Sequence, residues 1–278
     1  MNKEDFKNEI DKYMASIFDK SEYYQGILCE IYNEFYRVCK LHNIQFYMAF
    51  GTLLGAVRDN TMLPWDMDLD VLLPITEKDA LIKALEKDLS SEYYYVSPDN
   101  TPHHPISFIR ICKKGCDSFE FHVDVYYLLG APSDDVSQKH MQKRLKKVFK
   151  ERIYKYRDVS DIKKRSKIIY YMKILQNHIY GFCPLWLLNR RLDKLFWQND
   201  YDKSDYVIVV GDGAEVFPKE VFKTTYEKII NGCRFIIPQG SDEFLTIRYG
   251  NYKSYLPISN RFEEFYNGYK RKRDVLNE

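Results

Sequence analysis

The stretch over residues 47–74, YMAFGTLLGAVRDNTMLPWDMDLDVLLP, constrains the fold more than any other part of the chain. An apolar run ends at Gly51, a short helical pattern follows, and a strand-like segment then alternates apolar residues with Asp66, Asp68 and Asp70. Side chains of a strand alternate between its two faces, so the three carboxylates are predicted to share one face, roughly 7 Å apart. Like charges at this spacing repel each other, and a divalent cation with oxygen ligands would explain the row.

The Gly51-Thr52 pair suggests an anion site at the start of the short helix. Glycine allows a ligand to approach the backbone closely, and Thr52 at the N-cap would turn the first helical N–H groups toward a phosphate. Arg58, further along the same helix, could reach that phosphate. The alternative is an ordinary strand-to-helix turn with Arg58 in a surface ion pair. The aspartate row that follows favours the anion site.

A second predicted strand carries another aspartate. Residues 119–128, FEFHVDVYYL, alternate cleanly between apolar and polar positions. The polar face holds Glu120, His122, Asp124 and Tyr126. If this strand neighbours the first, Asp124 becomes the third member of a cluster with Asp68 and Asp70. The alternative is a half-exposed antiparallel strand whose polar face is wet.

Periodicity predicts the other elements of an α+β chain. Apolar residues spaced by three and four predict helices over 22–41, 76–89 and 241–248. Short apolar runs predict strands over 44–50, 93–96, 106–112 and 206–210. Thr76 and Ser241 are the expected N-caps of the later helices. Asn231-Gly232 between apolar runs is the strongest short signal of a β-hairpin. His103 and His104 form a candidate ligand pair, and the lack of a third ligand nearby favours a plain loop.

Residues 134–200 differ in kind from the rest. Between Lys143 and Lys167, twelve Lys or Arg stand against three acids, with apolar residues interleaved at helical spacing. Such a basic face attracts a nucleotide diphosphate, a pyrophosphate-linked lipid or an anionic membrane, unless it is simply a solvated face balanced elsewhere. We therefore expect three regions: a core over 1–130, a basic helical sub-domain over 131–200, and a C-terminal part over 201–278 that completes the core.

Composition narrows the classes of function. The net charge of +2 over 278 residues lacks the basic footprint of a nucleic-acid-binding protein, so no nucleic-acid partner is expected. Six cysteines without a CxxC pair are expected to be reduced thiols. The N-terminus lacks the pattern of a signal peptide, and no apolar run reaches the length of a spanning helix. We expect a cytoplasmic protein, with peripheral contact to an anionic membrane through residues 143–167.

Taken together, these motifs are similar to a known family. GTLLGAVRDNTMLPWDMDLDVLLP resembles the signature of the LicD family of phosphotransferases, which includes the fukutin-type proteins. The family form is a GTLLGAxR run followed by PWDDDxD. Its acidic positions are matched by Asp66, Asp68 and Asp70, and Met67 departs from it. HVDVYYL resembles the family's later apolar-Asp-apolar strand and places Asp124. FPKEVF and the YGNY of residues 249–252 resemble its C-terminal elements.

The resemblance implies a nucleotidyltransferase-type core, a mixed β-sheet flanked by helices, with a divalent metal ion. The implied ligands of Mg²⁺ (or Mn²⁺) are Asp68, Asp70, Asp124 and, as a further candidate, Asp66. The first three are also the implied catalytic residues. The resemblance places Gly51 and Thr52 at the donor phosphates. Arg58 and Arg110 are the candidates to balance the charge of the leaving CMP.

Family members transfer a phospho-substituent from a CDP-activated donor, classically phosphocholine from CDP-choline, to a sugar hydroxyl. The expected partners are therefore a CDP-alcohol and a glycan, a teichoic-acid precursor or a lipid-linked oligosaccharide. Two alternatives stay open. The chain could transfer the nucleotide moiety itself to a small acceptor, or it could be a non-catalytic scaffold at a membrane.

Overall fold

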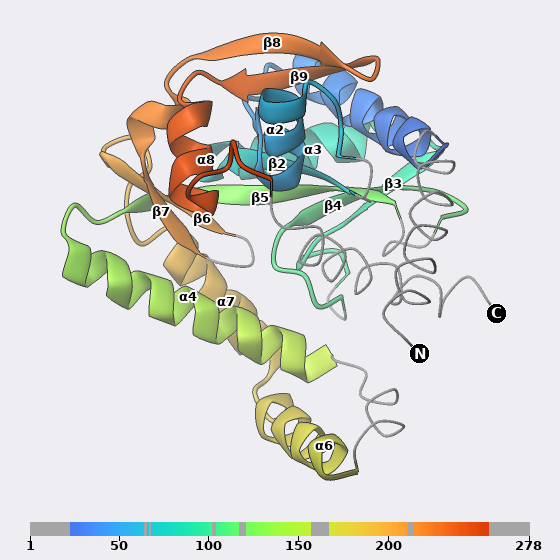
Figure 1. Cartoon of the computed structure of the whole chain (residues 1–278). Helices are drawn as coiled ribbons and strands as arrows, with labels where there is room; N and C mark the ends of the chain where they lie inside the picture. The colour runs from blue at the N-terminus through green and yellow to red at the C-terminus, as the bar shows by residue number, and fades with distance from the viewer. Residues whose placement is uncertain are drawn as a thin grey trace, which may run out of the picture.

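The structure, a computed structural model, describes residues 23–63, 66, 68–101, 104–116, 121–156, 167–210 and 214–255 (Figure 1). A helix over residues 23–41 comes first. The first part of the sheet and its connections follow: β1 (Tyr47–Met48), α2 (Phe50–Leu54), the π-helix η1 (Gly55–Asp59), β2 (Leu69–Pro74), η2 (Ile75–Glu77), α3 (Lys78–Asp88), β3 (Tyr93–Val96), β4 (Ile109–Lys113) and β5 (His122–Ala131). The rest comprises α4 (Asp135–Tyr156), α6 (Lys167–Gly181), α7 (Leu185–Phe196), β6 (Tyr206–Val210), β7 (Glu215–Pro218), η3 (Lys219–Phe222), β8 (Thr225–Ile230), β9 (Cys233–Pro238) and α8 (Ser241–Tyr249).

β5 is the central strand of a mixed, seven-stranded sheet, which confirms the predicted α+β class. β2 pairs with it in parallel along one edge, while β4 and then β6 pair antiparallel along the other. Every residue of β2 is buried, and in β5 only Tyr126 is partly exposed. Strands covered on both faces normally consist of apolar residues. The buried polar residues His122, Asp124 and Asp70 therefore stand out.

A sharp turn joins β1 to α2 in front of β2. Phe50 has a left-handed backbone with φ of 45°, rare for a bulky residue. The prediction that Thr52 is the N-cap of α2 is wrong, because Ala49 holds that position. The Thr52 hydroxyl instead accepts the backbone N–H of Asp70, 2.9 Å away, and the Asp70 carbonyl accepts the N–H of Ala49 at 3.0 Å. These bonds fix the start of α2 against the first aspartate stretch.

Other predicted boundaries also moved. The helix expected over 76–89 begins as the 3-10 turn η2, and Glu77 rather than Thr76 precedes α3. Gly240 rather than Ser241 is the N-cap of α8. Neither helix start has a hydrogen bond from a capping side chain. In each case the chain enters the helix directly from the preceding turn.

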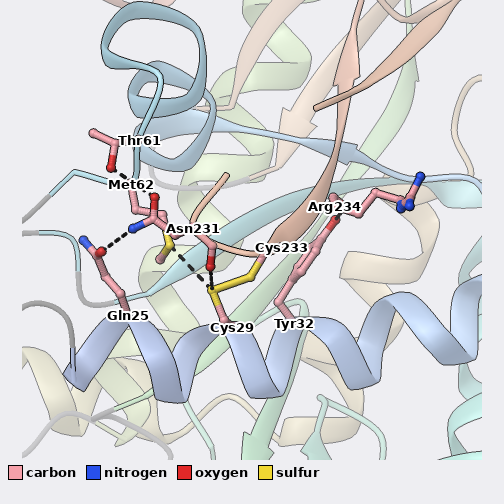
Figure 2. Close-up of a disulfide and its surroundings, with 8 residues drawn as sticks. All are labelled: Gln25, Cys29, Tyr32, Thr61, Met62, Asn231, Cys233 and Arg234. Carbon is pink, nitrogen blue, oxygen red and sulfur yellow. Dashed lines mark hydrogen bonds between the residues drawn. A yellow bond between two sulfur atoms is a disulfide. The ribbon is translucent and has the colours of Figure 1, made fainter. Parts of the chain in front are cut away.

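The hairpin β8–β9 covers α2 and η1 (Figure 1), and Lys228 Nζ donates to the Ala56 carbonyl at 2.7 Å. Cys29 and Cys233 form a disulfide that joins the helix over 23–41 to β9, with Cα atoms 5.9 Å apart (Figure 2). The expectation of six reduced thiols is therefore wrong for this pair, because strands and helices distant in sequence bring the two together. The free cysteines are Cys39, Cys112, Cys116 and Cys183.

The predicted hairpin turn is confirmed and tied into the same layer. Asn231 and Gly232 both have positive φ, as a tight hairpin turn requires. Asn231 Nδ2 donates to Gln25 Oε1 at 2.6 Å, and Thr61 Oγ1 donates to Asn231 Oδ1 at 3.1 Å (Figure 2). Thr61 lies in the loop that leads to Asp66, so this layer braces that loop.

The basic region forms a helical extension below the sheet in Figure 1. α4 and α7 pack against the core, where Arg152 is fully buried. Its guanidinium donates to the Ile106 carbonyl at 2.8 Å and to Asn189 Oδ1 at 2.7 Å, linking α4 to the loop before β4 and to α7. α6 projects from the far end of α4. Among the described helices, none combines the length and the apolar character needed to cross a bilayer.

Candidate active site

Two buried strands bring carboxylates together. The parallel register of β2 and β5 sets Asp70 opposite Asp124, as the sequence predicted. Paired residues of adjacent strands place their side chains on the same face of a sheet. Asp124 is 2% exposed, which excludes the alternative of a wet polar face. The polar side chains of this face therefore meet inside the protein.

Asp68 reaches the site from a loop rather than from a strand. β2 begins only at Leu69, so the predicted row of three aspartates on one strand is wrong: Asp66 and Asp68 precede the strand. His122 Nε2 lies 3.5 Å from Asp68 Oδ2 and 3.6 Å from Asp124 Oδ2. One donor atom from each of these three residues lies within 4.8 Å of the others. We call Asp68, His122 and Asp124 the site triad.

Arg110 binds the buried carboxylate of the triad. Its Nε and Nη2 donate to the two Asp124 oxygens at 2.6 and 2.8 Å, a bidentate pair. Burial lowers the pKa of Arg110, but the hydrogen bonds and charge of Asp124 outweigh burial and leave that pKa raised. Tyr126 also donates to Asp124 Oδ2 at 3.2 Å. Arg110 thus contacts Asp124. The sequence analysis had instead expected it to balance the charge of the leaving CMP.

Gly51 lies against Asp66. A Cβ on Gly51 would come within 2.6 Å of Asp66 Oδ2, so a larger residue would displace that carboxylate. Tyr249 of α8 is close to the same charges: burial, opposed by Arg248 and assisted by Asp70 and Asp66, raises its pKa to about 12. The glycine predicted to admit a ligand therefore admits a carboxylate of this chain.

Arg58 forms an ion pair, which is the alternative that the sequence analysis left open. Its Nε and Nη2 donate to the two oxygens of Asp59 at 2.9 and 2.7 Å. Its guanidinium lies over the Tyr255 ring, 4.4 Å from the centroid. The structure does not bring Arg58 into the triad.

The triad fits a divalent ion. Donor atoms 3.5 to 3.6 Å apart are close to the separation of two ligands bound to one ion at about 2.0–2.2 Å. His122 points Nε2 at both carboxylates, while its buried Nδ1 has no hydrogen-bond partner in the described part of the chain. The carboxylates of Asp68 and Asp124, which Nε2 faces, therefore set the orientation of the imidazole ring.

His122 is the residue that sequence reasoning missed. The sequence feature that could have found it is its position two residues before Asp124 on an alternating strand, which puts both side chains on one face. The pattern did not say whether that face was buried or what lay opposite. His104, the described member of the predicted histidine pair, is not in the triad; burial, and then the charge of Arg110, lower its pKa to about 4. His103 lies outside the described residues.

Comparisons with known proteins identify the family of the region that contains the triad. Residues 43–156 match the family described as "LicD/FKTN/FKRP, nucleotidyltransferase domain", so this part of the chain is a LicD-family domain. The match contains α2, β2, β4 and β5, and with them every residue of the triad. A relative in Haemophilus influenzae, lipopolysaccharide cholinephosphotransferase LicD, is 24% identical over 256 residues, covering 84% of this chain and 91% of that protein.

Proposed function

We propose that the protein transfers phosphocholine, or a related phospho-alcohol, from a CDP-activated donor to a sugar hydroxyl of a surface glycan. The observation that carries the proposal is the site triad, with His122 and Asp124 buried, within the residues that match the LicD family. The H. influenzae relative is named for transfer of phosphocholine to lipopolysaccharide. A lipid-carried glycan or a teichoic-acid precursor is the corresponding acceptor here.

The reaction breaks one phosphorus–oxygen bond and forms another. The acceptor hydroxyl oxygen attacks the phosphorus that carries the choline, the bond to the CMP oxygen breaks, and the hydroxyl proton leaves. We assign Asp70, on the same sheet face as Asp124, to accept this proton. Asp124 is held in place by Arg110 and Tyr126, so its carboxylate is oriented before substrate binds.

Asp68, His122 and Asp124 would hold the metal ion. A bound divalent ion supplies neutralisation of charge on the attacking and leaving oxygens. Mg²⁺ prefers an all-oxygen shell, while an imidazole nitrogen suits transition ions. The mixed donor set therefore favours Mn²⁺ over the Mg²⁺ expected first.

Aromatic rings beside Asp124 support an alcohol with a quaternary ammonium. Tyr126 packs 4.3 Å from Phe108 and 5.2 Å from Phe50, centroid to centroid. Ring faces attract a trimethylammonium group. We propose that Phe108 and Tyr126 contact the choline.

The test is to incubate the protein with a panel of CDP-alcohols, Mn²⁺ or Mg²⁺, and a soluble glycan acceptor, and to measure CMP. We expect CMP release to be fastest with CDP-choline. The family description favours one alternative, transfer of the nucleotide itself. Release of pyrophosphate from a nucleoside triphosphate, without CMP release from any CDP-alcohol, would overturn the proposal in favour of that alternative. No turnover and no binding of either donor would favour a scaffold.

A further inference from the structure

α6 exposes the side that a helix of a globular protein normally buries. Ile168, Met172, Leu175 and Ile179 recur at helical spacing and form one apolar stripe. These four side chains are 59–76% exposed, and no residue of α6 is buried. Two apolar side chains that follow α6 in sequence are exposed as well, Phe182 at 84% and Trp186 at 63%. We call these six residues the α6 stripe.

The contacts of α6 with α4 use its other side. Tyr180 stacks on Tyr154 of α4 at 5.2 Å, and Lys173 lies over the same ring. Lys155 of α4 donates to the carbonyls of Gly181 and Cys183 at 2.7 and 2.9 Å, which holds the end of α6. α6 is therefore fixed to α4 by polar and aromatic contacts, and the α6 stripe points elsewhere.

The helices that carry and adjoin the α6 stripe are basic. α4, α6 and α7 together hold thirteen Lys or Arg against three acids. The exposed lysines of α4 include Lys143, Lys146, Lys147 and Lys150. The centres of protein–protein interfaces are depleted in Lys. A helix that combines an apolar face, Trp or Tyr and flanking Lys is typical of one that lies in the interface of an anionic bilayer.

We propose that the α6 stripe inserts into the surface of an anionic lipid bilayer, with the α4 lysines on the lipid headgroups. At fifteen residues, α6 lies in the interface and does not cross. The sequence pointed to residues 143–167 for such contact. In this proposal, the basic residues of that range that lie in α4 supply the electrostatic attraction to the lipid headgroups. Residues 168–186 supply the apolar side chains that insert. This inference goes beyond the proposed function and does not depend on it.

Vesicle sedimentation with the full chain tests the proposal. Vesicles of equal parts phosphatidylglycerol and phosphatidylcholine should bind the protein, and vesicles of phosphatidylcholine alone should bind at least about tenfold more weakly. High salt should weaken the anionic binding, since it screens the lysines. An absence of binding to the anionic vesicles would overturn the proposal.

A double variant isolates the stripe from the charge. Met172→Ser with Leu175→Ser keeps every lysine and should lower the vesicle partition coefficient by about tenfold or more. Both side chains are exposed, so circular dichroism and thermal midpoint should match the wild type. Ile229→Ser, which removes an apolar side chain 70% exposed on β8, is the matched control and should bind as the wild type does. Equal binding of the double variant would overturn the proposal.

Insertion has a readout of its own. Brominated lipids should quench the fluorescence of Trp186 in the wild type, and Trp186→Phe should remove this quenching. Unquenched fluorescence on bound vesicles would overturn insertion. A concentration-dependent dimer that the double variant abolishes would show the stripe meeting a second copy, which also overturns it. None of these measurements uses turnover, and CMP release with a soluble acceptor uses no membrane, so the two proposals fail separately.

Discussion

The sheet around Asp124 and the helix α6 differ in what they bury: the sheet buries charged side chains, and α6 exposes apolar ones. At the sheet, Arg110 and Asp124 are buried as a bidentate pair among apolar strands. At α6, Met172 and Leu175 are exposed on a helix of a basic region. Burying charge is costly unless it is paired, and exposing large apolar side chains forfeits their burial energy.

Stability alone accounts for neither region. Sequences depart from the rules of burial chiefly at functional sites, where the departure serves a ligand. We therefore interpret the sheet region as the place where the chain meets a metal ion and a phosphate. We propose that the α6 region is where it meets a bilayer. The predictions below test each side of this comparison.

The largest effect is expected at Asp68, the partly exposed member of the triad. Asp68→Asn removes the ligand charge and should lower turnover about 10²–10³-fold, because the lost charge acts in the transition state. Steady-state CMP release measures it, and Asp202→Asn, an exposed aspartate elsewhere, is the control. Asp66→Asn should be milder, as that carboxylate packs against Gly51. Equal small losses at Asp66 and Asp68 would mean that the metal is held elsewhere.

The next effect is on folding. Arg110→Leu leaves the Asp124 carboxylate buried without its bidentate partner, which should cost about 3–5 kcal/mol of unfolding free energy. Urea unfolding followed by circular dichroism measures it. Arg234→Leu breaks the exposed Arg234–Glu227 pair and should cost less than about 1 kcal/mol. Similar costs for the two variants would contradict the account of the buried pair.

The layer above α2 provides a third test. Cys29→Ala with Cys233→Ala opens a link across 204 residues and should cost about 2–4 kcal/mol. Urea midpoints with and without reductant measure the same quantity on the wild type. Cys116→Ala, a free cysteine, is the control and should be near neutral. A wild-type midpoint that reductant leaves unchanged would contradict the disulfide.

The smallest effect is expected on α6. In the absence of lipid, Leu175→Ala should change the unfolding free energy by less than about 0.5 kcal/mol, because the side chain is already in water. Leu192→Ala on α7, buried in the core, should cost about 2–5 kcal/mol. Thermal and urea unfolding of both variants measure the difference. A comparable cost at Leu175 would show that the stripe is covered in solution.

The sequence predicted those parts of the fold that local patterns determine. The strand Tyr206–Val210 and the turn at Asn231 follow from short signals that need no distant partner. Alternation placed Asp124 on the polar face of its strand, and its position beside the first aspartate stretch was predicted on the condition that the two strands are neighbours. The sequence also placed α6 within the expected helical sub-domain over 131–200, but did not say whether another element covers its stripe.

Features that depend on long-range pairing were beyond local patterns. The register of β2 on β5 decides that His122 meets Asp68, and neither strand encodes that register alone. The Cys29–Cys233 disulfide likewise depends on the packing of β9 against the first helix. The division into domains, the cytoplasmic location and the roles of the site residues stay predictions.

Metal binding tests the central claim most directly. Calorimetric titration of the wild-type protein with Mn²⁺ should show one dominant site, and His122→Gln and Asp68→Asn should each weaken it by about tenfold or more. No binding by the wild type, or unchanged affinity in both variants, would contradict a metal ion held by Asp68, His122 and Asp124.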